Sequence, residues 1–101
     1  MVDKPVFSAL ADPTRRQIVD WLVEEGSGTA TGFADRLTIS RQAVARHLQE
    51  LGSAGLVISE KSGREMRFTL QTEALIDAAA WLDQRAEAWD RTLIRLRSHL
   101  E

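Results

Sequence analysis

The sequence predicts a mainly α-helical protein with a small β-hairpin wing, arranged as a winged helix-turn-helix with a long C-terminal dimerisation helix. Three observations support this fold class. Two short helical patterns are separated by the tight turn 38–40. Two strand-like runs, 56–60 and 65–70, follow and flank a turn signal at 61–64. Apolar residues then recur at helical spacing along 72–100. We expect residues 1–101 to form one domain.

The first helices are predicted from their end signals. A short apolar stretch at 6–10 indicates one or two helical turns. Asp12-Pro13 then reads as an N-cap followed by proline at the first helical position, where no amide is needed. Gly26 ends this helix, and 26–29 is expected to be a loop. The apolar stripe of the helix is predicted to contain Ile18, Val19, Leu22 and Val23.

The helix-turn-helix is predicted from a second set of signals. Phe33, Ala34 and Leu37 make one face of a short helix. Ser40 is placed to cap the helix that follows, and Gly55 closes that helix. Its buried side is predicted from the i, i+4, i+7 spacing of Val44, Leu48 and Leu51. Thr72 is expected to cap the last helix.

The outward face of the second helix carries the side chains that could read DNA. Arginine can bind guanine N7 and O6 with two hydrogen bonds, and glutamine can do the same for adenine. Either arginine could instead bind phosphate, which positions the protein without reading sequence. The predicted contacts in this region are Ser40, Arg41, Gln42, Ala45, Arg46 and Gln49.

Basic residues also lie at or beside the tip of the predicted hairpin. Lys61, Arg64 and Arg67 would lie over the DNA backbone or the minor groove, where cations displace condensed counterions. The net charge of the chain is −2, which by itself argues against a nucleic-acid partner. The basic residues are concentrated in the middle segment 36–71, however, which holds six of them against three acidic ones, and such a local excess is typical of a small DNA reader.

Composition excludes several other kinds of site. The chain has no cysteine, so disulfides, cysteine nucleophiles and thiolate metal sites are excluded. His47 falls toward the buried side of its helix and is expected to be packed and hydrogen-bonded, while His99 is expected to be exposed near the terminus. No long apolar run or signal-peptide pattern occurs, so we expect a cytoplasmic protein that neither binds nor spans a membrane.

The last helix carries a heptad pattern. Its apolar residues are spaced alternately by four and three positions, which favours pairing with a helix of a second subunit over folding back onto the same domain. The predicted dimer contacts are Leu75, Ala79, Leu82, Ala86, Trp89, Leu93 and Leu96, together with Phe7 near the N-terminus, and Leu100 ends the same apolar row. A two-fold dimer would present two reading helices about 34 Å apart, so the operator should be an inverted repeat.

Three segments resemble the ArsR/SmtB-type regulators. They are the opening stretch 7–18, the recognition-helix stretch 39–57 and the wing stretch 62–68. The resemblance implies a winged helix-turn-helix DNA-binding protein that acts as a homodimeric repressor.

The departures from the family pattern concern the metal sites. The family's thiolate motif would fall at Thr29-Ala30-Thr31, where no sulfur is present, and the last helix lacks the paired Asp and His ligands. We therefore expect no metal and no cofactor, as in the metal-free members of the family, which the Trp81/Trp89 helix resembles. Ala45 stands where the family often has Ser or Thr, which puts one polar contact in doubt.

Two other classes of function are alternatives to a repressor. A winged-helix module that docks on another protein is the main alternative, and the acidic overall charge favours it. An enzyme is the least favoured class, because the sequence holds no nucleophile motif and no paired carboxylates in a glycine-rich context.

Overall fold

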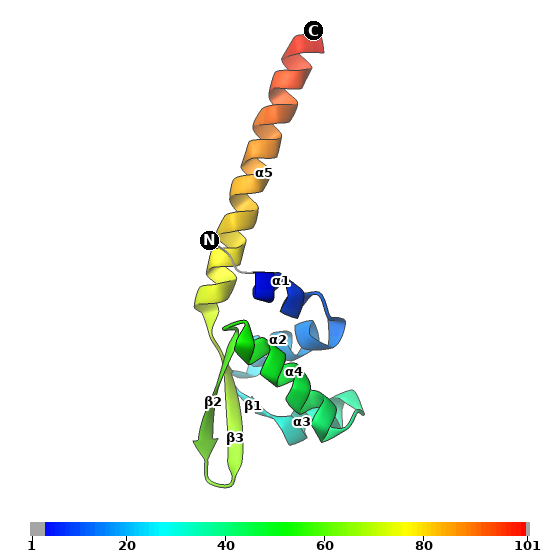
Figure 1. Ribbon diagram of the computed structural model, residues 1–101, viewed down its shortest axis with the longest axis vertical. Helices are drawn as coiled ribbons and strands as arrows, with labels where there is room; N and C mark the ends of the chain where they lie inside the picture. The colour runs from blue at the N-terminus through cyan, green and yellow to red at the C-terminus, as the bar shows by residue number, and fades with distance from the viewer. Residues whose placement is uncertain (1–3, 101) are drawn as a thin grey trace.

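The computed structural model describes residues 4–100 as a small winged body with a long helix rising from it (Figure 1). The described part is 66 × 24 × 22 Å in extent. Its elements are α1 (Lys4–Leu10), α2 (Pro13–Glu25), β1 (Gly28–Thr29), α3 (Ala30–Leu37), α4 (Arg41–Ser53), β2 (Val57–Ser62), β3 (Glu65–Leu70) and α5 (Thr72–Leu100). The predicted fold class is confirmed.

The predicted helix starts are confirmed at two positions. Asp12 accepts a hydrogen bond from the backbone N–H of Arg15 at 3.0 Å, and Pro13 is the first residue of α2. Ser40 Oγ accepts from the backbone N–H of Ala43 at 3.1 Å and so caps α4. Each cap satisfies one amide that the first helical turn leaves unpaired. The entry of α4 is therefore fixed by local chemistry.

The core lies where α1, α2, α3 and α4 meet the base of the hairpin and the start of α5. Its most completely buried side chains are Ile18, Leu22, Val44, Leu48, Leu51 and Leu56. The i, i+4, i+7 face predicted for α4 is thus the buried face. The prediction for α2 is wrong at Val23, which is 63% exposed, because it lies beyond the edge of the stripe that Ile18 and Leu22 define.

The wing is part of a three-stranded antiparallel sheet with the order β1-β3-β2. Residues 28–29, expected to be loop, pair instead with β3, with Gly28 opposite Phe68. The hairpin register puts Ser62 opposite Glu65, so its loop is the two residues Gly63 and Arg64. Gly63 has φ +63°. The turns that are favoured in two-residue hairpin loops require a positive φ at the first loop residue.

Among residues 4–100, helix α5 contacts the rest of the domain only near its start. Ala78 is buried, Leu75 is half-buried, and the ring of Trp81 lies 5.5 Å from that of Phe7 in α1. Beyond this contact α5 runs clear of the body (Figure 1). At about 1.5 Å per residue, its 29 residues span roughly 43 Å. Among residues 4–100, no helix has the length and apolarity needed to cross a bilayer.

Candidate nucleic-acid interface

Helix α4 presents a polar, solvent-exposed face opposite its buried side. The two glutamines and two arginines predicted to read DNA are exposed, as is Ala45 between them. Ser40 is also exposed; its Oγ accepts the cap hydrogen bond, and its O–H can still donate to a phosphate oxygen. These residues are Ser40, Arg41, Gln42, Ala45, Arg46 and Gln49. The structure thus brings the predicted α4 residues together on one face, with Ser40 at its entry.

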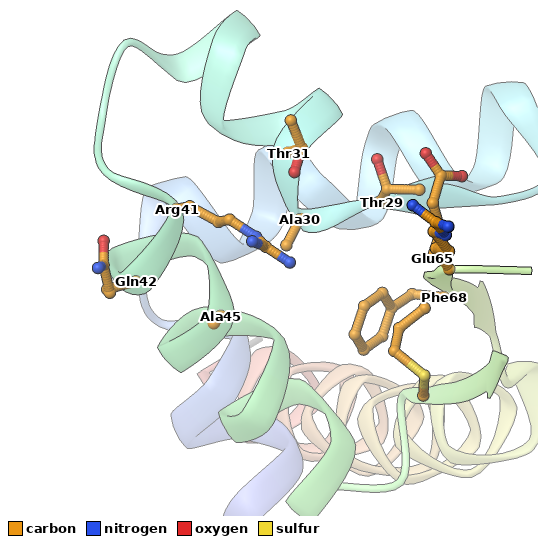
Figure 2. Close-up of a pocket in the computed structure, with 10 residues that line it drawn as sticks. Thr29, Ala30, Thr31, Arg41, Gln42, Ala45, Glu65 and Phe68 are labelled. Carbon is orange, nitrogen blue, oxygen red and sulfur yellow. The ribbon is translucent and has the colours of Figure 1, made fainter.

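A pocket of about 420 Å³ lies between the start of α4, the start of α3 and the wing. Figure 2 shows Arg41 reaching from α4 into this pocket, whereas Gln42 points away from it. Phe68 forms part of the opposite wall. The remaining lining residues are Thr29, Ala30, Thr31, Gln42, Ala45, Arg64, Glu65 and Met66. The reading helix and the wing therefore border a common hollow that carries two arginines and one carboxylate.

The three basic residues predicted for the wing occupy two different environments. Lys61 and Arg64 are exposed at the hairpin end. Arg67 is half-buried, and its Nε and Nη2 donate hydrogen bonds to Ser27 Oγ at 3.2 and 3.0 Å. Its Nη1 also lies 3.6 Å from Glu65 Oε2. Arg67 therefore ties the wing to the turn after α2, a contact that the sequence did not predict.

A network of Arg15, His47 and Asp12 connects α4 to α1 and α2. The sequence did not predict this network. Arg15 Nη1 lies 3.3 Å from His47 Nδ1, and its Nε donates to the backbone carbonyl of Ala9 at 2.7 Å. His47 Nδ1 is also 3.9 Å from Asp12 Oδ2. The packed histidine expected from the sequence is confirmed. Arg15 joins the C-terminal end of α1 to the recognition helix.

The pKa of Asp12 is lowered from its ordinary value of 3.8. The main cause is the hydrogen bond from the backbone N–H of Arg15, and the charges of His47 and Arg15 act in the same direction, while burial opposes them. The carboxylate that caps α2 is therefore ionised throughout the neutral range.

A second unforeseen cluster fixes α3 to α2. The guanidinium of Arg36 stacks over the ring of Trp21, 3.9 Å from its centroid, and donates to Glu25 Oε1 at 2.9 Å. Trp21 stacks in turn on Phe33, with 5.8 Å between centroids and 9° between ring planes. The guanidinium meets the aromatic face only after α2 and α3 have packed together. The spacing of these residues in the sequence therefore could not predict the contact.

The predicted dimer residues divide between two surroundings. Phe7 and Leu75 are half-buried against their own domain. The others are exposed on α5, where Leu82 is 52%, Trp89 is 61% and Leu93 is 40% exposed. We call the exposed row the α5 seam, and it consists of Ala79, Leu82, Ala86, Trp89, Leu93, Leu96 and Leu100.

Comparisons with known proteins identify the family. Residues 10–60 match the family described as "Helix-turn-helix domain". The transcriptional repressor SdpR of Bacillus subtilis is 35% identical over 77 residues, which cover 76% of this chain and 84% of SdpR. An ArsR-like transcriptional regulator from Rhodococcus sp. RHA1 has a similar structure, with a TM-score of 0.84, 39% identity, and coverage of 96% of this chain and 91% of that one.

A third relative is described as a homodimeric winged helix-turn-helix DNA-binding domain from Mycobacterium bovis. It has a TM-score of 0.66 and 26% identity, covering 82% of this chain and 76% of that one. Together with the exposed Arg and Gln face of α4, these likenesses define a DNA-binding protein. The chain belongs to the ArsR-type winged helix-turn-helix transcriptional regulators, which are not enzymes.

Proposed function

We propose that this regulator is a homodimeric repressor that binds an inverted-repeat operator and does not respond to a metal. The observation that carries the proposal is the α5 seam, a row of apolar side chains, most of them large, that the chain's own domain leaves exposed. Exposure of this much apolar surface to water costs free energy, and packing against a partner helix buries that surface. A second copy supplies the same seam, as two-fold symmetry requires.

The relatives support both the dimer and the repressor. The Mycobacterium bovis domain is described as homodimeric, and the match to SdpR covers 84% of that repressor. In a two-fold dimer the two α4 helices would enter the major groove one helical turn apart, at about 34 Å. A dimer bound at a promoter would then block access to it, and it would do so in the cytoplasm, where bacterial DNA lies.

The contacts to DNA divide into two kinds. We assign base contacts to Gln42, Arg46 and Gln49, whose side chains project from the outermost side of α4, with the methyl group of Ala45 beside them. Positioning contacts belong to Ser40, Arg41, Lys61 and Arg64. We assign Arg67 to holding the wing in place, because its guanidinium is hydrogen-bonded to Ser27.

The proposal of metal independence rests on the chemistry of the donor groups. The chain has no cysteine, and Thr29, Ala30 and Thr31 offer no thiolate at the start of α3. Among residues 4–100, no three His, Asp or Glu side chains converge as a metal site. Hydroxyl groups alone are weak ligands for the soft metals that thiolate sites select.

The test combines sedimentation with selection of DNA. Analytical ultracentrifugation of the purified chain should give a dimer at micromolar concentration. Selection from a pool of random duplexes should enrich two half-sites in inverted orientation, with centres about one helical turn apart. A monomer that enriches single, unpaired half-sites would overturn the dimeric operator, and a pool with no enriched sequence would overturn sequence-specific binding.

A further inference from the structure

The pocket between α4, α3 and the wing combines arginines from two elements with an apolar wall, unlike the base-reading face. We propose that it binds one backbone phosphate of the DNA strand that passes between the recognition helix and the wing. Arg41 and Arg64 then hold this phosphate together, and Arg41 is a phosphate ligand, not a base reader. This assignment rests on the proposed function, because it names the part of the DNA that the pocket receives.

The direction of Arg41 is the first argument. On a helical wheel of about 100° per residue, Arg41 and Ala45 lie roughly 60° and 100° from Val44, the centre of the buried side. Both line the pocket together with Gln42, so the first turns of α4 face the wing. The outermost positions, roughly 140° to 200° from Val44, belong to Gln42, Arg46 and Gln49. Figure 2 agrees, since Arg41 enters the pocket and Gln42 turns away.

The composition of the walls is the second argument. Arg41 comes from α4 and Arg64 from the hairpin loop, so two arginines from different elements line the pocket. Guanidinium groups bind phosphate oxygens with charged, directional hydrogen bonds. Met66 and Phe68 add an apolar wall that suits the carbon atoms of a deoxyribose. Ala45 also lines the pocket, and its small side chain takes up little of the space there.

Glu65 also lines the pocket and opposes an anion there. Its carboxylate lies 3.6 Å from Arg67, which offsets part of its charge. The negative charge of Glu65 must repel a phosphate in the pocket. The direction in which DNA affinity changes when this charge is removed therefore tests the proposal. We expect Glu65→Gln to tighten DNA binding, and a weaker or unchanged affinity would contradict a phosphate at this position.

Because backbone contacts do not depend on sequence, the main test uses a random 20-base-pair duplex. Fluorescence anisotropy over a salt series should show that Arg41→Ala and Arg64→Ala each weaken binding by roughly tenfold or more. The double variant should lose less than the product of the two single effects, because both arginines hold the same phosphate. Arg91→Ala, an exposed arginine on α5 outside the seam, is the control and should change little. Multiplicative effects would mean two separate phosphates and would overturn the shared site.

A second measurement separates this assignment from the proposed function. On the selected operator, Arg41→Ala should bind all sequences more weakly but keep the wild-type base preference, whereas Arg46→Ala should lose preference at one position. A changed preference in Arg41→Ala would overturn the assignment while leaving the operator proposal intact. A wild-type protein without any base preference would overturn the operator proposal, while the random-duplex result would still decide the phosphate site.

Two further experiments test which anion the pocket binds and whether DNA occupies the pocket. Inorganic phosphate at constant ionic strength should displace the duplex no better than chloride does, because the site needs the connected backbone. Preferential displacement would overturn the backbone assignment in favour of a free anion. Ala45→Leu should obstruct the pocket from an exposed helix position and weaken random-duplex binding at least as much as Arg41→Ala, and unimpaired binding would contradict occupancy of the pocket.

Discussion

The close approach of Gly28 to the core gives a prediction that can be worked out in detail. A Cβ atom at this position would overlap Cζ of Phe33 and lie 2.8 and 2.9 Å from its Cε2 and Cε1. Phe33 is 2% exposed, and its ring is stacked against Trp21, so it has little freedom to move aside. Gly28→Ala should therefore strain both the core and the pairing of β1 with β3.

The expected magnitude follows from two opposing effects. Overpacking of a well-filled core costs about 1–3 kcal/mol, and three short contacts put this site toward the upper end. Alanine also lowers the conformational entropy of the unfolded chain relative to glycine, which stabilises the folded protein by about 0.4–1 kcal/mol. The net loss is about 1–2 kcal/mol. Since about 1 kcal/mol shifts Tm by roughly 4–8 °C for a domain of this size, Tm should fall by roughly 5–15 °C.

The assay is thermal unfolding by circular dichroism at one fixed protein concentration, because a dimer makes Tm concentration-dependent. Gly52→Ala in α4 is the matched control, since its added Cβ would meet only atoms of Val57 at 3.9 Å. It should stabilise the protein by about 0.5–1 kcal/mol, as alanine does in a helix. A Gly28→Ala protein that melts at or above the wild-type temperature would refute the packing described for Phe33.

Four other outcomes are expected. Leu93→Glu should give a monomer by light scattering and bind operator about 10²-fold or more weakly, whereas Ile94→Glu, 62% exposed outside the seam, should stay dimeric. Arg46→Ala should lose about 1–3 kcal/mol of discrimination on the operator in competition assays, with random-duplex binding less affected. Because the pKa of Asp12 is lowered in the fold, its charge should stabilise the protein fully above pH 3.8. The difference in unfolding free energy between wild type and Asp12→Asn should thus vanish as the pH falls through the lowered pKa, and a difference that grew on acidification would contradict this. Zinc or arsenite should leave operator affinity unchanged, and release of the DNA by either would disprove metal independence.

The helices were predictable because their signals are local. Asp12 and Ser40 are capping residues that bond within three positions along the chain, and the spacing of Val44, Leu48 and Leu51 defines a face without reference to other elements. The hairpin was predictable for the same reason, since Gly63 marks the turn. The outward face of α4 follows directly from its buried face, so most of the candidate site could be predicted as well.

The features that were missed depend on partners far away in the sequence. Strand β1 has only two residues, too few for any alternation, and exists because β3 pairs with it. Arg67 bonds a serine 40 positions away, and Arg15 contacts a histidine 32 positions away. Long polar side chains choose such partners only after packing, so their positions in the sequence did not reveal which role each would take.

The central claim is that a dimer of this chain reads an inverted repeat in DNA. Hydroxyl-radical footprinting on the region upstream of its own gene tests it most directly, since it reports sequence specificity, half-site spacing and symmetry in one experiment. We predict two protected half-sites related by two-fold symmetry, with centres about 34 Å apart along the duplex. Even, weak protection along the fragment, equal to that of random DNA, would contradict the claim.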